Sequence, residues 1–352
     1  MSFADPWSEA LIWFGSAALA AAMGLAVVAF PGQMIPVLLA YTVLLDGPHI
    51  FGTWTRVYAD PRERHLAGSL AWTSLLWFLP GFVALALDAG GVPYVFVAYL
   101  GLAALWGYYH LLRQNYGLLS ILSRNTGVTP AEHRVDHVFL QLGTWLPYAA
   151  FVAGHPLNRA EIGLAPMSTP ETYVVGALAT AAVAAIVAYA AVLATRARRG
   201  RPLRAGLFLL GPVMLFMAFV FGLIGSMEPL FAEPANLEQG FVAVGIATGA
   251  AHALQYVPFV MTLEGRRHAS GGSVWSAVAS RPHRWYALLA TASVAWGALS
   301  WWRGAIPGIA GLHGERIALA LFWGIMLHHY WLDQHIWRPH RDPRLRAELA
   351  AA

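Results

Sequence analysis

The sequence predicts an all-α protein, a polytopic transmembrane helical bundle of about ten spans. Hydrophobic residues make up 58% of the 352-residue chain and charged residues only 11%, and the mean hydropathy is +0.54. Apolar runs of about 20 residues, the length that crosses a hydrocarbon core of ~30 Å, recur from one end of the chain to the other. We therefore expect a single integral membrane domain over residues 1–352.

Each span is expected where an apolar run is long enough to cross the bilayer. The expected spans are 10–30, 34–58, 67–87, 92–122, 134–153, 170–195, 203–224, 240–263, 284–302 and 315–337. Within the second span, Asp46 is followed by Gly47 and Pro48. Because proline removes a backbone donor from a helix, we expect a local break near Asp46.

The loops between the spans alternate in charge. "ADPRERH", "SRNTGVTPAEHR", "RARRGRPLR", "EGRRHASGGSVWSAVASRPHR" and "RPHRDPRLRAELAA" are basic, whereas "DAGGVP" and "SMEPLFAEPANLEQ" are acidic or neutral. With ten spans, every basic loop falls on one side of the membrane, and the positive-inside rule places that side in the cytoplasm. Both termini are then expected to be cytoplasmic.

Composition excludes several function classes. The chain has no cysteine, which excludes disulfides, iron–sulfur clusters and thiolate-ligated haem. It has no lysine either, so its 22 basic residues are all arginine, and a P-loop lysine, a retinal Schiff base and pyridoxal-phosphate chemistry are excluded. The sequence pI is near 9.5, but the arginines lie in short loops between apolar runs, so we expect no nucleic-acid partner.

Histidines from four separate spans are expected at a similar depth, roughly 12–18 Å from the cytoplasmic ends of their helices at 1.5 Å per residue. They are His49, His110, His252 and the adjacent pair His328 and His329, and the carboxylates Asp46 and Asp333 fall in the same half of the membrane. An ionisable side chain at the bilayer centre costs roughly 2.5–3.5 kcal/mol, so these groups are expected to meet one another instead of facing lipid. Mutual hydrogen bonding between helices is the simplest explanation for any single histidine.

Helical phase separates the three histidines of "LHHYWLDQHIWR", residues 327–338. His329 and Asp333 are four residues apart and share a helix face, whereas His328 shares its face with His335. Near the cytoplasmic end of the fifth span, Thr129 and Glu132 predict a capping box, with Pro130 at the first helical position.

The remaining histidines divide into a reserve ligand and loop residues. His133 and His137 follow that box with the spacing of a metal-binding pair, and His137 is the deeper of the two. We expect ordinary contacts with solvent or lipid headgroups for the loop histidines His65, His268, His283 and His340.

Imidazole and carboxylate donors without sulfur are typical of non-haem iron sites. We predict one or two iron ions, ligated by His49, His110, His252, His329, Asp333 and Asp46, with His137 and His328 in reserve. Zinc hydrolysis is disfavoured because no HExxH motif occurs and no glutamate is expected deep in a span. Gln114 and Tyr256 are further site residues, expected to orient the histidines. Arg56 and Arg113 are expected either to place a substrate carboxylate, phosphate or lipid headgroup, or to snorkel to the membrane surface or pair with Asp46 or Asp333.

Two other functions remain open at this point. One is a haem b protein held by two of the histidines, which leaves the aspartates unused. The other is a proton-coupled transporter in which intramembrane histidines and aspartates form a proton relay beside an interrupted helix.

The motifs "GPHIFGTWTRVYADPRERH", "HLLRQNYG", "HALQYVPF" and "HHYWLDQHIWR" resemble a family of uncharacterised bacterial polytopic membrane proteins. The shared patterns are PHxxxTxxR, HxxRQxYG, HxxQY and HxxxDxxIWR. The matching positions here are His49, Thr53, Arg56, His110, Arg113, Gln114, Tyr116, His252, Tyr256, His329 and Asp333. Asn115 departs from the glutamine of the pattern. The resemblance implies the cytoplasmic membrane of a bacterium and attaches no reaction, and the histidine boxes of membrane desaturases are not present as a set.

The predicted function is a membrane oxidoreductase that uses dioxygen for hydroxylation, desaturation or oxidation at nitrogen. Expected partners are membrane lipid, a small lipophilic substrate and an electron-donor protein reached from the cytoplasmic side.

Overall fold

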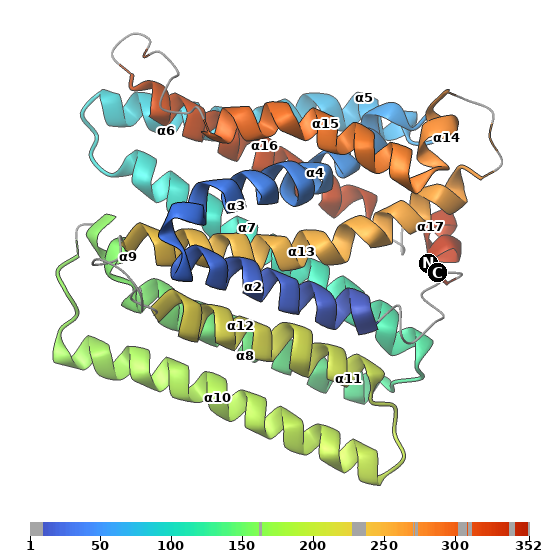
Figure 1. Cartoon of the computed structure of the whole chain (residues 1–352), viewed down its shortest axis with the longest axis horizontal. Coiled ribbons are helices and arrows are strands. Elements are labelled where there is room, and N and C mark those ends of the chain that lie inside the picture. The colour runs from blue at the N-terminus through green and yellow to red at the C-terminus, as the bar shows by residue number, and fades with distance from the viewer. Residues whose placement is uncertain are drawn as a thin grey trace. The chain divides into compact units, whose positions relative to one another are not determined.

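The computed structural model describes residues 10–161, 164–226, 237–269, 271, 274–301, 308, 312–337 and 342–350 (Figure 1). These residues form helices joined by turns and loops, without a β-strand, so the predicted all-α fold class is confirmed. The elements, in chain order, are η1 (Leu11–Gly15), α2 (Ser16–Ala29), η2 (Pro31–Gln33), α3 (Met34–Tyr41), η3 (Thr42–Asp46), α4 (Gly47–Trp54), η4 (Thr55–Ala59), α5 (Arg64–Leu75), η5 (Leu76–Phe78), α6 (Leu79–Ala89), α7 (Val95–Asn125), α8 (Pro130–Gly154), α9 (Pro156–Glu161), α10 (Thr169–Arg198), α11 (Arg204–Phe208), η6 (Leu209–Leu215), α12 (Phe216–Ala218), η7 (Phe219–Leu223), η8 (Ile224–Ser226), α13 (Leu237–Arg267), α14 (Val274–Ala279), α15 (Pro282–Trp301), α16 (Gly314–Ile336) and α17 (Pro343–Ala350).

Seven of the continuous helical segments are long and apolar enough to cross a membrane. They are Leu11–Ala29, Met34–Ala59, Trp72–Ala89, Val95–Asn125, Thr169–Arg198, Arg204–Ser226 and Val242–Arg267. The other predicted spans coincide with α8, α15 and α16, which are long helices outside this apolar set. The membrane character of the chain is therefore supported, and the total of ten spans stays a prediction.

The chain divides into two compact units, each built from segments that are distant in sequence. Unit 1 combines Leu39–His110 with Tyr256–Ala352, and unit 2 combines Phe3–Leu38 with Leu111–Gln255. The boundaries fall inside α3, α7 and α13, so each of these helices contributes one part to each unit.

The helix from Met34 to Ala59, which belongs to unit 1 from Leu39 on, runs through the sequence Asp46-Gly47-Pro48 without breaking. The expected break is replaced by the π-helical turn η3, in which the backbone N–H of Gly47 bonds to the carbonyl of Thr42. The wider turn accommodates the proline ring and the backbone donor that proline lacks. The local irregularity is thus real, but the helix remains continuous.

Helix α15 lies along α4 in unit 1 (Figure 1). A Cβ atom at Gly47 would come within 2.3 Å of the Ser293 Cβ atom, and one at Gly52 within 3.1 Å of the Trp285 ring. Only glycine permits so close an approach of the two helices, which is a common device in membrane bundles. This contact fixes the helix that carries His49.

In unit 2, α8 and α10 form an antiparallel pair tied by buried polar contacts. The predicted capping box is confirmed, because the Thr129 side chain accepts from the Glu132 backbone N–H while the Glu132 side chain accepts from that of Thr129. One turn further, buried Asp136 accepts a 2.8 Å hydrogen bond from Tyr189 and a 3.1 Å hydrogen bond from Arg196. These contacts satisfy the carboxylate inside the helix pair.

Candidate metal centre

Four side chains of unit 1 converge on one buried point. They are His49 on α4, His110 on α7, and His329 and Asp333 on α16. Each offers one ligand atom, and these atoms all lie within 4.8 Å of one another. Their exposed fractions range from 0% to 6%, so the group is shielded from the surroundings of the helices.

The separations between these atoms suit a single metal ion. The Nε2 atoms of His49 and His329 are 2.8 Å apart, and Asp333 Oδ2 lies 3.5 Å from His110 Nε2 and 3.7 Å from His329 Nε2. Two ligands bonded at ~2.1 Å to one ion are roughly 3.0 Å apart at right angles and roughly 3.4 Å apart in a tetrahedron. Small side-chain rotations therefore suffice for all four groups to bind one ion.

The other oxygen of Asp333 is held by hydroxyl groups. Thr53 donates to Asp333 Oδ1 at 2.7 Å, and Tyr256 donates to the same oxygen at 3.2 Å. Trp337 in turn donates from Nε1 to the Tyr256 hydroxyl at 3.0 Å. Partners of this kind fix the orientation of a ligating carboxylate, and here they leave Oδ2 for the histidines.

The imidazole rings are positioned by aromatic contacts. Tyr330 stacks on His110 with ring centroids 4.4 Å apart, and Tyr256 meets His49 edge-on at 4.3 Å. Tyr330 can occupy this position because residue 107 is glycine, where a Cβ atom would lie 2.9 Å from the Tyr330 hydroxyl oxygen. Gly107 thus leaves room for the Tyr330 ring, and that ring positions His110.

Arg56 lies beside this group but is engaged by the protein itself. Its guanidinium lies 4.5 Å from the centre of the Trp337 ring, and Nη2 is 3.7 Å from Glu63 Oε1. The residue is only 1% exposed. This environment suits a residue that supports Trp337 better than one that contacts a substrate.

Two predicted ligands of unit 1 have partners outside the converging group. Asp46 accepts hydrogen bonds from Tyr41 at 3.1 Å and from Trp296 at 3.0 Å. The Nε2 atom of His328 is 2.9 Å from the Tyr58 hydroxyl. Neither belongs to the group that could hold a metal, which agrees with the separation of His328 from His329 by helical phase.

The remaining predicted site residues belong to unit 2. Gln114 donates to the backbone carbonyl of His252 at 2.9 Å, so a side chain expected to orient an imidazole holds the backbone of α13. His137 Nε2 lies 3.2 Å from Gln141 Nε2. Arg113 is exposed, and its guanidinium carbon lies 5.2 Å from the centre of the Tyr116 ring. A metal-ligating role of His252 and His137 stays a prediction.

Among the described residues, a second group also has the geometry of a metal site, and sequence reasoning missed it. It consists of Asp60, Glu264 and His268. The expectation of ordinary loop contacts for His268 is wrong, because this side chain is only 1% exposed. The missed signal is that Glu264 and His268 are four residues apart: "EGRRH" was assigned to a basic loop, whereas α13 continues to Arg267.

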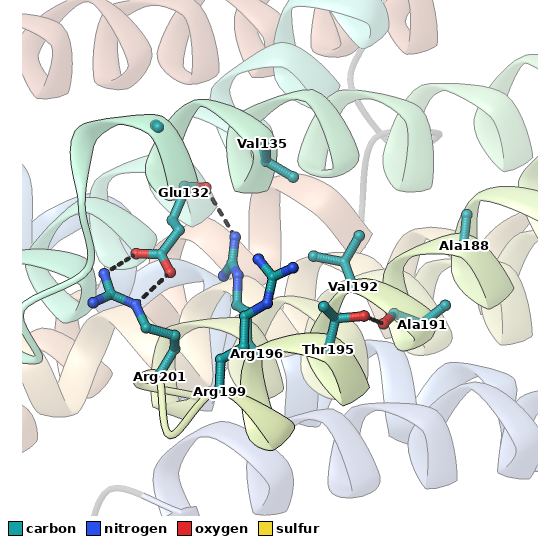
Figure 2. Close-up of a pocket in the computed structure, with 10 residues that line it drawn as sticks. Glu132, Val135, Ala188, Ala191, Val192, Thr195, Arg196, Arg199 and Arg201 are labelled. Carbon is teal, nitrogen blue, oxygen red and sulfur yellow. Dashed lines mark hydrogen bonds and ion pairs between the residues drawn. The ribbon is translucent and has the colours of Figure 1, made fainter.

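A surface pocket in unit 2 has a different character. Figure 2 shows Glu132, Arg196, Arg199 and Arg201 at its wall, beside apolar side chains of α8 and α10. Arg201 holds the Glu132 carboxylate with two hydrogen bonds, of 2.9 Å and 2.8 Å (Figure 2). Arg201 is thus paired with Glu132, and Arg196 is paired with Asp136 at 2.8 Å, so two of the three guanidinium groups of this pocket belong to structural ion pairs at the helix ends.

The chain matches no family model, no curated protein and no solved structure. The functional argument therefore depends on the site itself.

Proposed function

We propose that the protein is an integral-membrane non-haem iron oxidoreductase that uses dioxygen to hydroxylate, desaturate or N-oxidise a lipophilic or membrane-accessed substrate. The observation that carries this proposal is the convergence of His49, His110, His329 and Asp333 on one buried point. These helices are distant in sequence, and burying three imidazoles and a carboxylate together in an apolar bundle is costly without a bound cation.

The donor set favours iron. Three nitrogen donors and one oxygen donor without sulfur suit Fe(II), which accepts six ligands and would keep two positions open. When bound, such an ion supplies binding and reductive activation of dioxygen. The close spacing of the four donor atoms favours one ion at this point over two.

The surrounding residues have separable tasks in this proposal. Asp333 supplies negative charge, and Thr53 and Tyr256 hold its second oxygen so that the carboxylate cannot turn away. Trp337 fixes the Tyr256 hydroxyl, and Arg56 supports the Trp337 ring. Arg56 thus acts as a positioning residue, and a role of Arg113 in placing a substrate group stays a proposal.

The haem b alternative fits this geometry less well. Two histidines that ligate a haem lie on opposite faces of the iron, with their nitrogen atoms roughly 4 Å apart across the porphyrin plane. The Nε2 atoms of His49 and His329 are only 2.8 Å apart. That distance corresponds to neighbouring positions on one ion.

The proton-relay alternative is supported by one specific contact. The hydrogen bond between His49 and His329, with Asp333 next in line, forms a continuous titratable chain in unit 1. Such a chain can pass a proton without any metal. Chelation separates the two functions, because a relay keeps working in metal-free protein and an oxidase does not.

For the cellular setting, we propose the cytoplasmic membrane of a bacterium, with both termini in the cytoplasm. The long apolar helices with their exposed apolar side chains support a membrane location. The proposed orientation depends on the distribution of arginine in the sequence alone. Membrane lipid surrounds the bundle, and electrons arrive from a donor protein on the cytoplasmic side.

The test uses full-length protein purified in detergent after expression with ample iron. We expect iron bound at the four-residue group, no Soret band, and an EPR signal when nitric oxide, a probe for open Fe(II) positions, is added. His329→Asn should lose the iron and the signal, and His328→Asn is the matched control, because that neighbouring histidine contacts Tyr58. Wild-type protein without iron at this group would defeat the oxidase proposal, and a Soret band lost in His329→Asn would favour haem.

A further inference from the structure

The second buried group of unit 1 lies where two helices end. Asp60 follows η4, Glu264 lies in the last turn of α13, and His268 is the first residue after α13. Their exposed fractions are 0%, 1% and 1%. One potential ligand atom from each lies within 4.8 Å of the other two.

The atoms that face one another in this group make no hydrogen bond. They are Asp60 Oδ2, both carboxylate oxygens of Glu264, and His268 Nε2. His268 Nε2 lies 3.4 Å from Asp60 Oδ2 and 3.3 Å from Glu264 Oε2. Buried polar atoms without hydrogen bonds are costly, so several of them directed at one another indicate a missing partner.

The opposite atoms of the same side chains are held in place. Asp60 Oδ1 accepts a hydrogen bond from the backbone N–H of Arg62 at 2.9 Å. His268 Nδ1 lies 3.1 Å from the Ser276 hydroxyl oxygen. A metal-ligating histidine commonly uses its second nitrogen in this way, which fixes the ring and leaves Nε2 for the ion.

The charge of the surrounding network indicates the sign of the missing partner. The network holds four carboxylates, those of Asp60, Glu63, Glu264 and Glu348, and two guanidinium groups, those of Arg56 and Arg267. The carboxylates of these ion pairs thus outnumber the guanidinium groups, and the nearby Arg62 guanidinium, which donates to the Arg267 carbonyl, offsets part of this excess of negative charge. A missing partner that is a cation would offset the rest.

We propose that Asp60, Glu264 and His268 form a second metal site that holds a divalent transition-metal ion of the Mn²⁺, Fe²⁺ or Zn²⁺ class. Two carboxylates and one imidazole are suitable ligands for these ions. The ion joins the end of η4 to the end of α13 and so stabilises unit 1.

This site is separate from the four-residue group described above. Tyr256, which contacts that group, and Glu264 lie eight residues apart on α13, or roughly 12 Å along the helix axis at 1.5 Å per residue. The ions of a two-metal catalytic centre are only ~3.5–4 Å apart. The second site is therefore not the other half of a di-iron centre, and it does not depend on the oxidase proposal.

The competing explanation is a doubly protonated His268 that pairs with Asp60 and Glu264 without any metal. To separate the two, wild-type protein is stripped with a chelator, crystallised, soaked with Mn²⁺ and measured for anomalous scattering. We expect a peak within bonding distance, ~2.0–2.2 Å, of the three side chains. This measurement needs no variant and so does not depend on how a variant folds.

Metal analysis of variants gives the second readout. After loading with Mn²⁺ and desalting, Glu264→Gln and His268→Gln should each bind one equivalent less than wild type. Glu348→Gln is the matched control, because Glu348 belongs to the same network through Arg267 but is not in the three-residue group. It should bind as much Mn²⁺ as wild type, and Mn²⁺ should raise the Tm of wild type by more than that of His268→Gln.

The outcomes distinguish this inference from the proposed function. No anomalous peak between Asp60, Glu264 and His268 overturns the inference, whether or not the four-residue group binds metal. A peak here with none at His49 and His329 upholds the inference and counts against the oxidase. A peak at the four-residue group alone overturns the inference and is consistent with the proposed function.

Discussion

Replacing Thr53 by valine tests whether Asp333 is held ready to bind a metal ion. Thr53 is fully buried, and its hydroxyl donates to Asp333 Oδ1 at 2.7 Å. Valine has nearly the same shape, so the substitution removes the hydroxyl group without leaving a cavity. The carboxylate then keeps only the longer 3.2 Å bond from Tyr256 on that oxygen.

The expected magnitude follows from the type of bond that is lost. A hydrogen bond to a charged group contributes about 1.5–3 kcal/mol. Removing a partner of this kind from a metal ligand typically weakens metal binding 10- to 100-fold, or by about 1.4–2.7 kcal/mol. Because Tyr256 still holds the carboxylate, we expect a loss near the lower end of this range for Thr53→Val.

The assay is competition of the purified protein with a chelator of known affinity for Fe²⁺. Thr55→Val is the matched control, because its hydroxyl donates to the backbone carbonyl of Gly52 on the same helix. The reasoning is refuted if Thr53→Val binds Fe²⁺ as tightly as wild type, or if Thr55→Val loses as much affinity as Thr53→Val.

Three further predictions follow from individual contacts. Gly107→Ala should weaken metal binding several-fold by displacing Tyr330 from His110, whereas Gly101→Ala, at a position with open space on the same helix, should bind as wild type does; equal affinities would contradict the role of Tyr330. Exhaustive chelation should abolish the oxygen consumption that the protein adds to membranes, measured against membranes that contain His329→Asn, and an added oxygen consumption that survives chelation would contradict the iron oxidase. The hydrogen bonds from Arg201 hold the pKa of the Glu132 carboxyl well below its ordinary value. The ionised carboxylate therefore stabilises the fold fully at pH values above the ordinary pKa, and this stabilisation is lost as the pH falls through the lowered pKa. The Tm of Glu132→Gln should therefore lie below that of wild type at neutral pH, by the equivalent of about 1 kcal/mol or less for a partly exposed pair; the gap should narrow on acidification, and a gap independent of pH would count against the ion pair.

The fold class and much of the four-residue group could be predicted because both depend on local patterns. Apolar runs predict helices, and the spacing of His329 and Asp333 predicts that they share a face. The polar layer was expected to include His49 and His110 from their depth alone. They are expected to come together because an ionisable side chain that faces lipid alone is costly, whereas such side chains can hydrogen-bond to one another inside the bundle.

The positions of Asp46 and His328 could not be predicted from depth. Both were expected in the same layer as the ligands. The partners that hold them, Trp296 for Asp46 and Tyr58 for His328, come from parts of the chain whose packing the sequence does not specify. The depth of a residue in the membrane does not say which neighbouring helix its side chain faces. The azimuth of each helix depends on contacts such as the close approach of Ser293 to Gly47.

The group of Asp60, Glu264 and His268 was missed for a different reason. Charged residues near a helix end are usually solvated, and "EGRRH" has the composition of such an end. Burial of Glu264 and His268 arises because Asp60 and Glu63, from a distant segment, pack against them together with Arg267. A pairing of this kind leaves no trace in hydropathy.

The most direct test of the central claim is the metal content of the four-residue group. Iron analysis of purified wild-type protein beside His49→Ala, His110→Ala and His329→Ala should show that each variant loses the same equivalent of iron. His252→Ala, in the same experiment, decides whether the fourth predicted histidine belongs to the ligand set. If all three variants of the group retain as much iron as wild type, or if wild type holds none, His49, His110, His329 and Asp333 do not form a metal centre.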